Sequence, residues 1–135
     1  MLEGVSLYII AAVFVDDISL RELEGSVARI DLTGVQFSSL VENEFPMIFA
    51  PHLALLIYSD DSSADNGALE VTYYRGDEQI ARNVQPLTIE VGKFAYRLVR
   101  AEMEFMEPGT IEARCRIGDS DPIVVPYTIK IQNED

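Results

Sequence analysis

The stretch from Phe45 to Tyr58 constrains the fold of this chain more than any other part of the sequence. It carries no charged residue from Pro51 onward, and its apolar residues occupy odd and even positions alike. A helix is disfavoured here because Pro46 and Pro51 stand near its start and the run is short. We therefore predict a strand that is buried on both faces, at the centre of a β-sandwich.

The length and composition of the chain fit one folded domain, 1–135. A chain of 135 residues buries about two-thirds of the surface that its unfolded form exposes. Hydrophobic residues make up 48% of the sequence, which is enough to fill a core. No repeat, low-complexity tract or linker divides the sequence, so we expect a single domain.

Short segments of β type recur along the chain and are separated by turn signals. Their number and spacing predict an all-β fold of about eight or nine strands with at most one short helical turn. The expected architecture is a two-sheet antiparallel β-sandwich, immunoglobulin-like or similar. The predicted strands are 5–15, 27–32, 45–58, 69–74, 78–84, 87–91, 94–105, 110–117 and 123–131.

Four local features refine this prediction. The segment 16–25 is expected to be a loop, with a helical turn that Ser19 could cap. Gly34 predicts a bulge or a bend. The apolar phase of 94–105 changes at Leu98, which predicts a bulge or a strand that switches sheets there. Pro126 cannot donate a ladder hydrogen bond, which predicts a sheet edge or a bulge at that position.

The charge balance excludes several classes of partner. The chain has 23 acidic and 10 basic residues and a formal net charge of −13. Such a surface repels phosphates and anionic lipids, so we expect neither nucleic acid nor membrane as a partner. The excess of acids is accounted for by solubility. An acidic decoy protein is an alternative, which requires carboxylates at phosphate-like spacing.

The single cysteine, Cys115, rules out an internal disulfide and favours a reducing compartment. It alternates with apolar residues, which predicts a buried thiol rather than a nucleophile. The apolar run 5–15 lacks a basic flank and is too short to span a bilayer. These features predict a cytoplasmic protein.

No constellation of residues predicts catalysis. His52 is the only histidine, so a packed histidine or one at the rim of the domain is expected there. Neither a catalytic triad nor a zinc site can be assembled around it. A phosphate-binding glycine loop and a nucleophile elbow are both missing from the sequence. We therefore expect no enzyme and no cofactor.

Acidic loops leave a calcium site as an alternative. Loops at strand ends of a sandwich can converge and offer oxygen ligands to a hard cation. The weak candidates for metal ligands are Asp60, Asp61 and Asp65. Their spacing does not match a calcium-loop motif, so a calcium-dependent binding module remains a second hypothesis.

The order of several short motifs spans nearly the whole chain. Leu23-Glu24-Gly25 leads to Gly34-Val35, Phe45-Pro46 opens the apolar strand, and Glu107-Pro108-Gly109-Thr110 precedes the last strand pair. This order resembles a family of small uncharacterised bacterial domains, classed as a domain of unknown function and expected to be β-sandwiches. The resemblance rests on structural motifs, and it implies no catalytic residue.

The sequence as a whole favours a non-enzymatic binding or interaction module. Its partner is expected to be another protein or a second copy of the chain. Tyrosine is enriched at protein interfaces, so the interaction surface is expected at Tyr73, Tyr74 and Tyr96.

Overall fold

The computed structural model describes residues 7–23, 27–42, 45–59, 66–89, 94–118 and 120–131. This part of the chain is all-β, without helix, and so contains no helix that could cross a membrane. It forms twelve strands rather than the eight or nine predicted. They are β1 Leu7–Val15, β2 Asp17–Leu23, β3 Val27–Thr33, β4 Ser38–Val41, β5 Met47–Phe49, β6 His52–Ser59, β7 Asn66–Arg75, β8 Glu78–Thr88, β9 Phe94–Arg100, β10 Met103–Phe105, β11 Gly109–Ile117 and β12 Ile123–Ile131.

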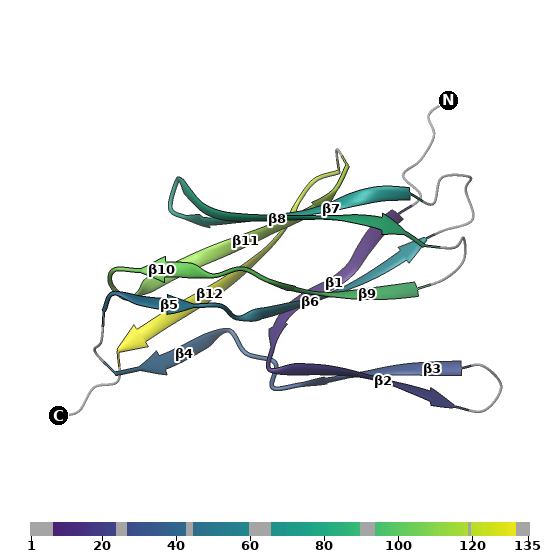
Figure 1. Cartoon of the computed structure of the whole chain (residues 1–135), viewed down its shortest axis with the longest axis horizontal. Helices are drawn as coiled ribbons and strands as arrows, with labels where there is room; N and C mark the ends of the chain where they lie inside the picture. Colours follow the sequence, from purple (N-terminus) through teal and green to yellow (C-terminus); the bar gives the residue numbers. More distant parts are fainter. Residues whose placement is uncertain are drawn as a thin grey trace.

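The strands form two larger sheets and two strand pairs. The five-stranded sheet has the order β4-β12-β11-β7-β8, and the three-stranded sheet has the order β1-β6-β9. The pair β10-β5 lies where β6 and β9 would continue toward one end of the molecule, and the pair β2-β3 is a separate hairpin (Figure 1). All of these pairings are antiparallel except that of β12 with β4. Figure 1 shows the hairpin β2-β3 set apart from β9 and β6, while the two larger sheets overlap in this view.

The hydrophobic core lies between the two larger sheets. Both sheets contribute alternate residues to it, as strands with one face turned inward must. Across the two layers the rings of Phe14 and Tyr127 meet edge to face, 4.8 Å between centroids. The core residues of the three-stranded sheet include Leu7, Phe14, Leu53, Leu55, Ile57 and Val99, and those of the five-stranded sheet include Leu69, Val71, Tyr73, Leu87, Ile111, Cys115, Tyr127 and Ile129.

Strand β6 confirms the prediction of a central strand, but the predicted burial on both faces is complete only on the core face, because Leu56 and Tyr58 on the outer face are half-buried. It pairs with β1 on one side and with β9 on the other. Leu53, Leu55 and Ile57 are buried in the core, while Ala54 and Leu56 point to the opposite face of the sheet. The predicted single strand is interrupted at Ala50 and Pro51, which separate β5 from β6.

The prediction of a loop with a helical turn at 16–25 is wrong for residues 16–23, and its last two residues lie outside the described part of the chain. Ser19 lies within β2, which pairs with β3 from Asp17↔Thr33 to Leu23↔Val27. Its alternation of Ile18 and Leu20 with polar residues is a strand pattern with only two apolar positions, too short to distinguish from a loop.

The predicted bulge at Leu98 and Val99 is wrong, and the alternative, a switch of sheets, occurs after Arg100 instead, where the chain passes from β9 to β10 of the pair β10-β5. Strand β9 pairs with β6 in one unbroken register from Phe94↔Tyr58 to Arg100↔His52. Both phases of β9 carry apolar residues because the sheet has apolar surface on both faces. The bulge lies instead on β1, where the pairing shifts between Ile9 and Ala11 and leaves Ile10 as the extra residue.

Gly34 ends β3 as predicted, whereas the prediction of an edge strand or a bulge at Pro126 is wrong for β12 as a whole, because β12 lies between β4 and β11 in continuous register with β11. Gly34 follows β3 with a φ of 71°, and a Cβ there would clash with the Asp16 side chain. Pro126 pairs with Glu112 of β11, while the β4 side of β12 is paired only from Thr128 to Ile131. Pro126 therefore stands where its missing N–H leaves no ladder bond unmade.

Replacing Leu55 with alanine tests the central place of β6. Leu55 is buried, so Leu55→Ala should lower the free energy of unfolding by about 2–5 kcal/mol through lost burial and a cavity. The matched control is Leu40→Ala on β4, where the side chain is exposed and a change within about 0.5 kcal/mol is expected. Urea unfolding followed by circular dichroism measures both. Equal changes in the free energy of unfolding for Leu55→Ala and Leu40→Ala would contradict the central place of β6.

The buried thiol of Cys115 gives a second test. Burial raises the pKa of Cys115 to about 12, so the thiol stays protonated in the folded protein at pH 8. A disulfide reagent should therefore not label the native protein at pH 8, and should label one thiol per chain in urea. Unfolding exposes the thiol to its ordinary pKa, so stability should fall as pH rises above about 9. Cys115→Ala should make this fall shallower, and rapid labelling of the native protein would show that the thiol is exposed.

Candidate binding cleft

The three tyrosines predicted to form an interaction surface lie in three different environments. Tyr73 is 0% exposed and belongs to the core, so the prediction that it is exposed is wrong. Tyr74, its neighbour on β7, points to the outer face of the five-stranded sheet. Tyr96 on β9 lies on the far side of the three-stranded sheet and lines a cleft there. The alternation of β7 buries one of two adjacent tyrosines, and the sequence does not show which one.

The cleft lies between the hairpin β2-β3 and the outer face of the sheet β1-β6-β9. It has a volume of about 820 Å³. The hairpin turns Leu20 and Ile30, which are paired across its strands, toward Leu56 and Tyr96 of the sheet. In full, the cleft is lined by Ile10, Leu20, Ile30, Leu56, Phe94, Ala95, Tyr96, Arg97 and Leu98.

Large apolar side chains in the cleft remain exposed. Phe94 is 64% exposed, Ile10 52% and Leu20 47%. Ile10 faces the cleft because the bulge on β1 adds it to the strand without moving its neighbours out of the core. The two apolar walls are therefore present but are not packed against each other, unlike the walls of the core.

A row of aromatic rings crosses the outer face of the same sheet. Tyr8, Tyr58 and Phe94 are register partners on β1, β6 and β9. Their centroids are 5.6 Å apart from Tyr8 to Tyr58 and 4.6 Å from Tyr58 to Phe94. Phe94 belongs both to this row and to the cleft, so the apolar surface continues from one to the other.

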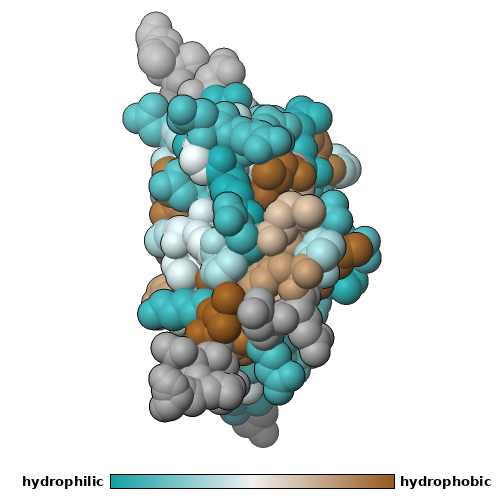
Figure 2. All heavy atoms as spheres, turned by 90° about the vertical axis from the view of Figure 1, so that its left-hand side faces the viewer, coloured by the Kyte–Doolittle hydropathy of each residue, from teal (hydrophilic) through white to brown (hydrophobic). Residues whose placement is uncertain are grey.

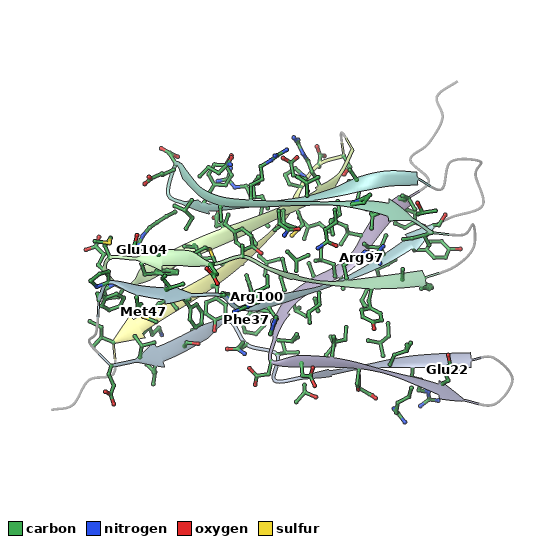
Figure 3. All side chains as sticks on the ribbon, viewed as in Figure 1. Glu22, Phe37, Met47, Arg97, Arg100 and Glu104 are labelled. Carbon is green, nitrogen blue, oxygen red and sulfur yellow. The ribbon has the colours of Figure 1, made fainter. Side chains whose placement is uncertain are left out.

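Arg97 is the only charged residue among those that line the cleft. Its Nη1 donates a hydrogen bond of 2.9 Å to the carbonyl oxygen of Tyr96 on the same strand. Among the described residues it makes no ion pair, whereas Arg21, Arg82, Arg114 and Arg116 each contact a carboxylate. Figure 3 shows Arg97 and Arg100 along β9, with Glu22 on the hairpin far from both. The cleft is thus apolar with one cation, in a chain that carries 23 acids.

The outer face of the five-stranded sheet has a different character. Its shallow depression of about 310 Å³ contains Tyr74, but the guanidinium of Arg114 covers that ring at 3.9 Å from the centroid. Glu70 accepts hydrogen bonds from Arg82 and Arg116, and these bonds keep the pKa of Glu70 below its usual range. The charges there pair with one another, which is the ordinary chemistry of a solvated sheet face.

A third depression contains His52, which is half-buried at the start of β6. It has a volume of about 420 Å³ and adjoins a chain of hydrogen bonds. The Tyr127 hydroxyl donates to Gln36 Oε1 and shares a hydrogen bond with Ser39 Oγ, and Gln36 Nε2 donates to Asp16 Oδ1. Burial raises the pKa of Tyr127, so its hydroxyl remains protonated. These groups satisfy one another and connect β12 to the segments that flank β2 and β3.

The end of the molecule at β4, β5 and β10 carries exposed apolar residues. Figure 2 shows this end, with apolar side chains gathered toward its middle and hydrophilic ones around them. Exposed apolar residues on the elements at this end include Leu40, Ile48 and Met106. Leu40, Ile48 and Met106 line none of the three depressions described above.

Metal ligation is not indicated by the described part of the chain. No group of three or more His, Cys, Asp or Glu side chains there could hold an ion. Asp60, Asp61 and Asp65 lie outside the described residues, so the calcium alternative stays a prediction.

Comparison with known proteins does not identify a family for this chain. Neither a scan against models of protein families nor a search of curated proteins gives a match.

The hydrogen-bond chain around Tyr127 is tested by Tyr127→Phe. The substitution leaves Ser39 and Gln36 without their common partner while keeping the buried ring, so the free energy of unfolding should fall by about 1–3 kcal/mol. Tyr8→Phe removes a hydroxyl from an exposed side chain and should change stability by less than about 0.5 kcal/mol. Thermal or urea unfolding compares the two. An unchanged stability of Tyr127→Phe would remove the structural role assigned to this network.

Proposed function

We propose that this protein is a non-enzymatic binding module whose binding surface is the cleft between β2-β3 and the outer face of β1-β6-β9. In this proposal the two larger sheets form a two-sheet antiparallel β-sandwich, immunoglobulin-like or similar, that holds the cleft. The partner is another protein, and the module acts in the cytoplasm without nucleic acid or membrane. The predicted resemblance to a bacterial family of unknown function is compatible with such a role.

The observation that carries the proposal is the exposed apolar lining of a hollow surface. Leaving large apolar side chains in water forgoes about 25 cal/mol for each Å² that could be buried. Phe94, Ile10 and Leu20 remain exposed on opposite walls of one cleft, although the core nearby is tightly packed. Contiguous exposed apolar surface of this kind marks binding sites in soluble proteins.

The dimensions and composition of the cleft also support binding. Its volume of about 820 Å³ falls in the range of roughly 300–1,000 Å³ that is usual for ligand sites. It combines many apolar residues with few polar groups, Arg97 and the hydroxyl of Tyr96, which suits recognition of an apolar ligand with fixed orientation. Neither of the other two depressions has an apolar lining of this kind.

A fluorescent apolar anion, anilinonaphthalene sulfonate, tests whether the cleft binds. The dye should gain fluorescence on the native protein, and Leu20→Glu should lower this gain at least about tenfold by placing a charge on the apolar wall. Leu20 is partly exposed, so the substitution should leave the fold intact, as circular dichroism would verify.

The matched control is Leu40→Glu, which places the same charge at an exposed leucine on β4, away from the cleft. It should leave the dye signal unchanged. Loss of signal in both variants, or in neither, would contradict the assignment of the binding surface to the cleft.

A further inference from the structure

We infer that the cleft takes an extended segment of a partner protein, which adds a strand to the edge of β9 and alternates apolar with acidic residues. This inference rests on the proposed function and specifies its ligand.

The edge of β9 has no bulge, proline or short strand of the kind that protects the other edges of the two larger sheets, and its protection is the charge of Arg97 and Arg100. An edge strand presents unpaired N–H and C=O groups to any extended chain, and bulges, prolines, short strands and charged side chains are the usual defences. Strand β1 has the bulge at Ile10, β8 has Pro86 and a shift in register, and β4 has four residues. Strand β9 runs in unbroken register over seven residues, without proline.

The cleft extends to the backbone of this edge. Five consecutive residues of β9, 94–98, line it, although side chains of a strand alternate between two faces. Residues of both phases therefore contribute to the lining, which places the cleft beside the backbone of β9. A purely apolar ligand there would leave the polar groups of the edge unpaired, whereas an extended peptide would pair with them.

The two phases of β9 dictate the pattern of the incoming strand. Phe94, Tyr96 and Leu98 lie on the outer face beside the hairpin, so neighbouring side chains of the partner on that face would be apolar. Ala95 and Arg97 lie in the other phase, because Arg97 pairs with Leu55, which faces the core. Side chains that stand beside each other on one face interact most strongly when their charges are opposite. The partner therefore carries an acid beside Arg97.

The position of the Arg97 guanidinium fits this pairing. Backbone carbonyls of a strand lie in the plane of the sheet, so the bond to the Tyr96 carbonyl keeps the guanidinium close to the strand. It is paired with no carboxylate among the described residues. An incoming carboxylate would supply the bidentate partner that a guanidinium accepts best.

The same charge argues against a second copy of this chain as the occupant. The residues of β9 include Arg97 and Arg100 and no acid. Pairing β9 with β9 of another copy would bring like charges together at the new junction, which is unfavourable. The cation therefore deters self-pairing and selects an acidic strand.

Three synthetic peptides test the inference by fluorescence anisotropy on the whole chain. The first alternates valine or isoleucine with glutamate, the second has lysine at each glutamate position, and the third has the first composition with two prolines inserted. The first should bind, the second should bind at least about fivefold more weakly, and the third should not bind, because proline removes donors and breaks strand addition.

Substitutions at Arg97 give the matched test of charge. Arg97→Gln should weaken the glutamate peptide about fivefold, the change that one partly exposed ion pair produces, and Arg97→Glu should reverse the preference in favour of the lysine peptide. Arg82→Glu, on the outer face of the other large sheet, serves as the control and should leave peptide binding unchanged. Circular dichroism verifies that each variant is folded.

The outcomes separate this inference from the proposed function. If no peptide binds but the dye still enters the cleft and is excluded by Leu20→Glu, the cleft binds something else and the strand-addition inference is wrong. If the dye also fails, both proposals are wrong. Concentration-dependent dimers in sedimentation that Arg97→Glu strengthens would identify a second copy as the occupant, and equal binding of the glutamate and lysine peptides would remove the role of Arg97.

Discussion

Burial of β6 on its inner face, together with apolar residues on its outer face, is the constraint on which the rest of the structure depends. One face contacts the five-stranded sheet and forms the core, through Leu53, Leu55 and Ile57. The opposite face presents Leu56 to the hairpin. A sheet that is apolar on both faces needs cover on both faces. The core supplies one cover in full, and the hairpin supplies the other only in part.

This incomplete cover connects the fold to the proposed function. Three features that are separate in the sequence meet at one place: the bulge that turns Ile10 outward, the apolar face of β2-β3, and the edge of β9. Each has an energetic cost in a protein that acts alone, because each exposes apolar surface or unpaired backbone groups to water. A partner strand in the cleft would bury the apolar surface and pair the backbone groups at the same time.

Charged side chains are paired differently on the outer face of the five-stranded sheet and in the cleft. On the outer face of the five-stranded sheet, arginines are held by Glu70 and Glu112, so this face is neutralised within itself. Arg97 in the cleft is left without a carboxylate among the described residues. The chain has a net charge of −13, and in the proposed binding mode Arg97 would favour an acidic ligand that the overall charge would otherwise repel.

The all-β fold and its central strand could be predicted from the sequence, but the cleft could not. The uncharged run after Pro51 predicted the central strand because burial on both faces leaves no polar position. The same logic failed for β9, whose apolar residues in both phases predicted a bulge or a switch of sheets at Leu98 although the sheet has two apolar faces. Tyr73 and Tyr74 are chemically equivalent in sequence, and only the register of β7 buries one and exposes the other. The cleft depends on where β2-β3 lies against a distant sheet, and no local pattern encodes that position.

The central claim, that β9 is an open edge beside an uncovered apolar face, is tested most directly by amide hydrogen exchange of the native protein observed by NMR. The account predicts that the amides of β6, paired on both sides, exchange slowly along the strand, while β9 shows slow and fast amides in alternation because only one side of it is paired. Uniformly slow exchange along β9 in the isolated chain would contradict it, because the edge would then already be covered.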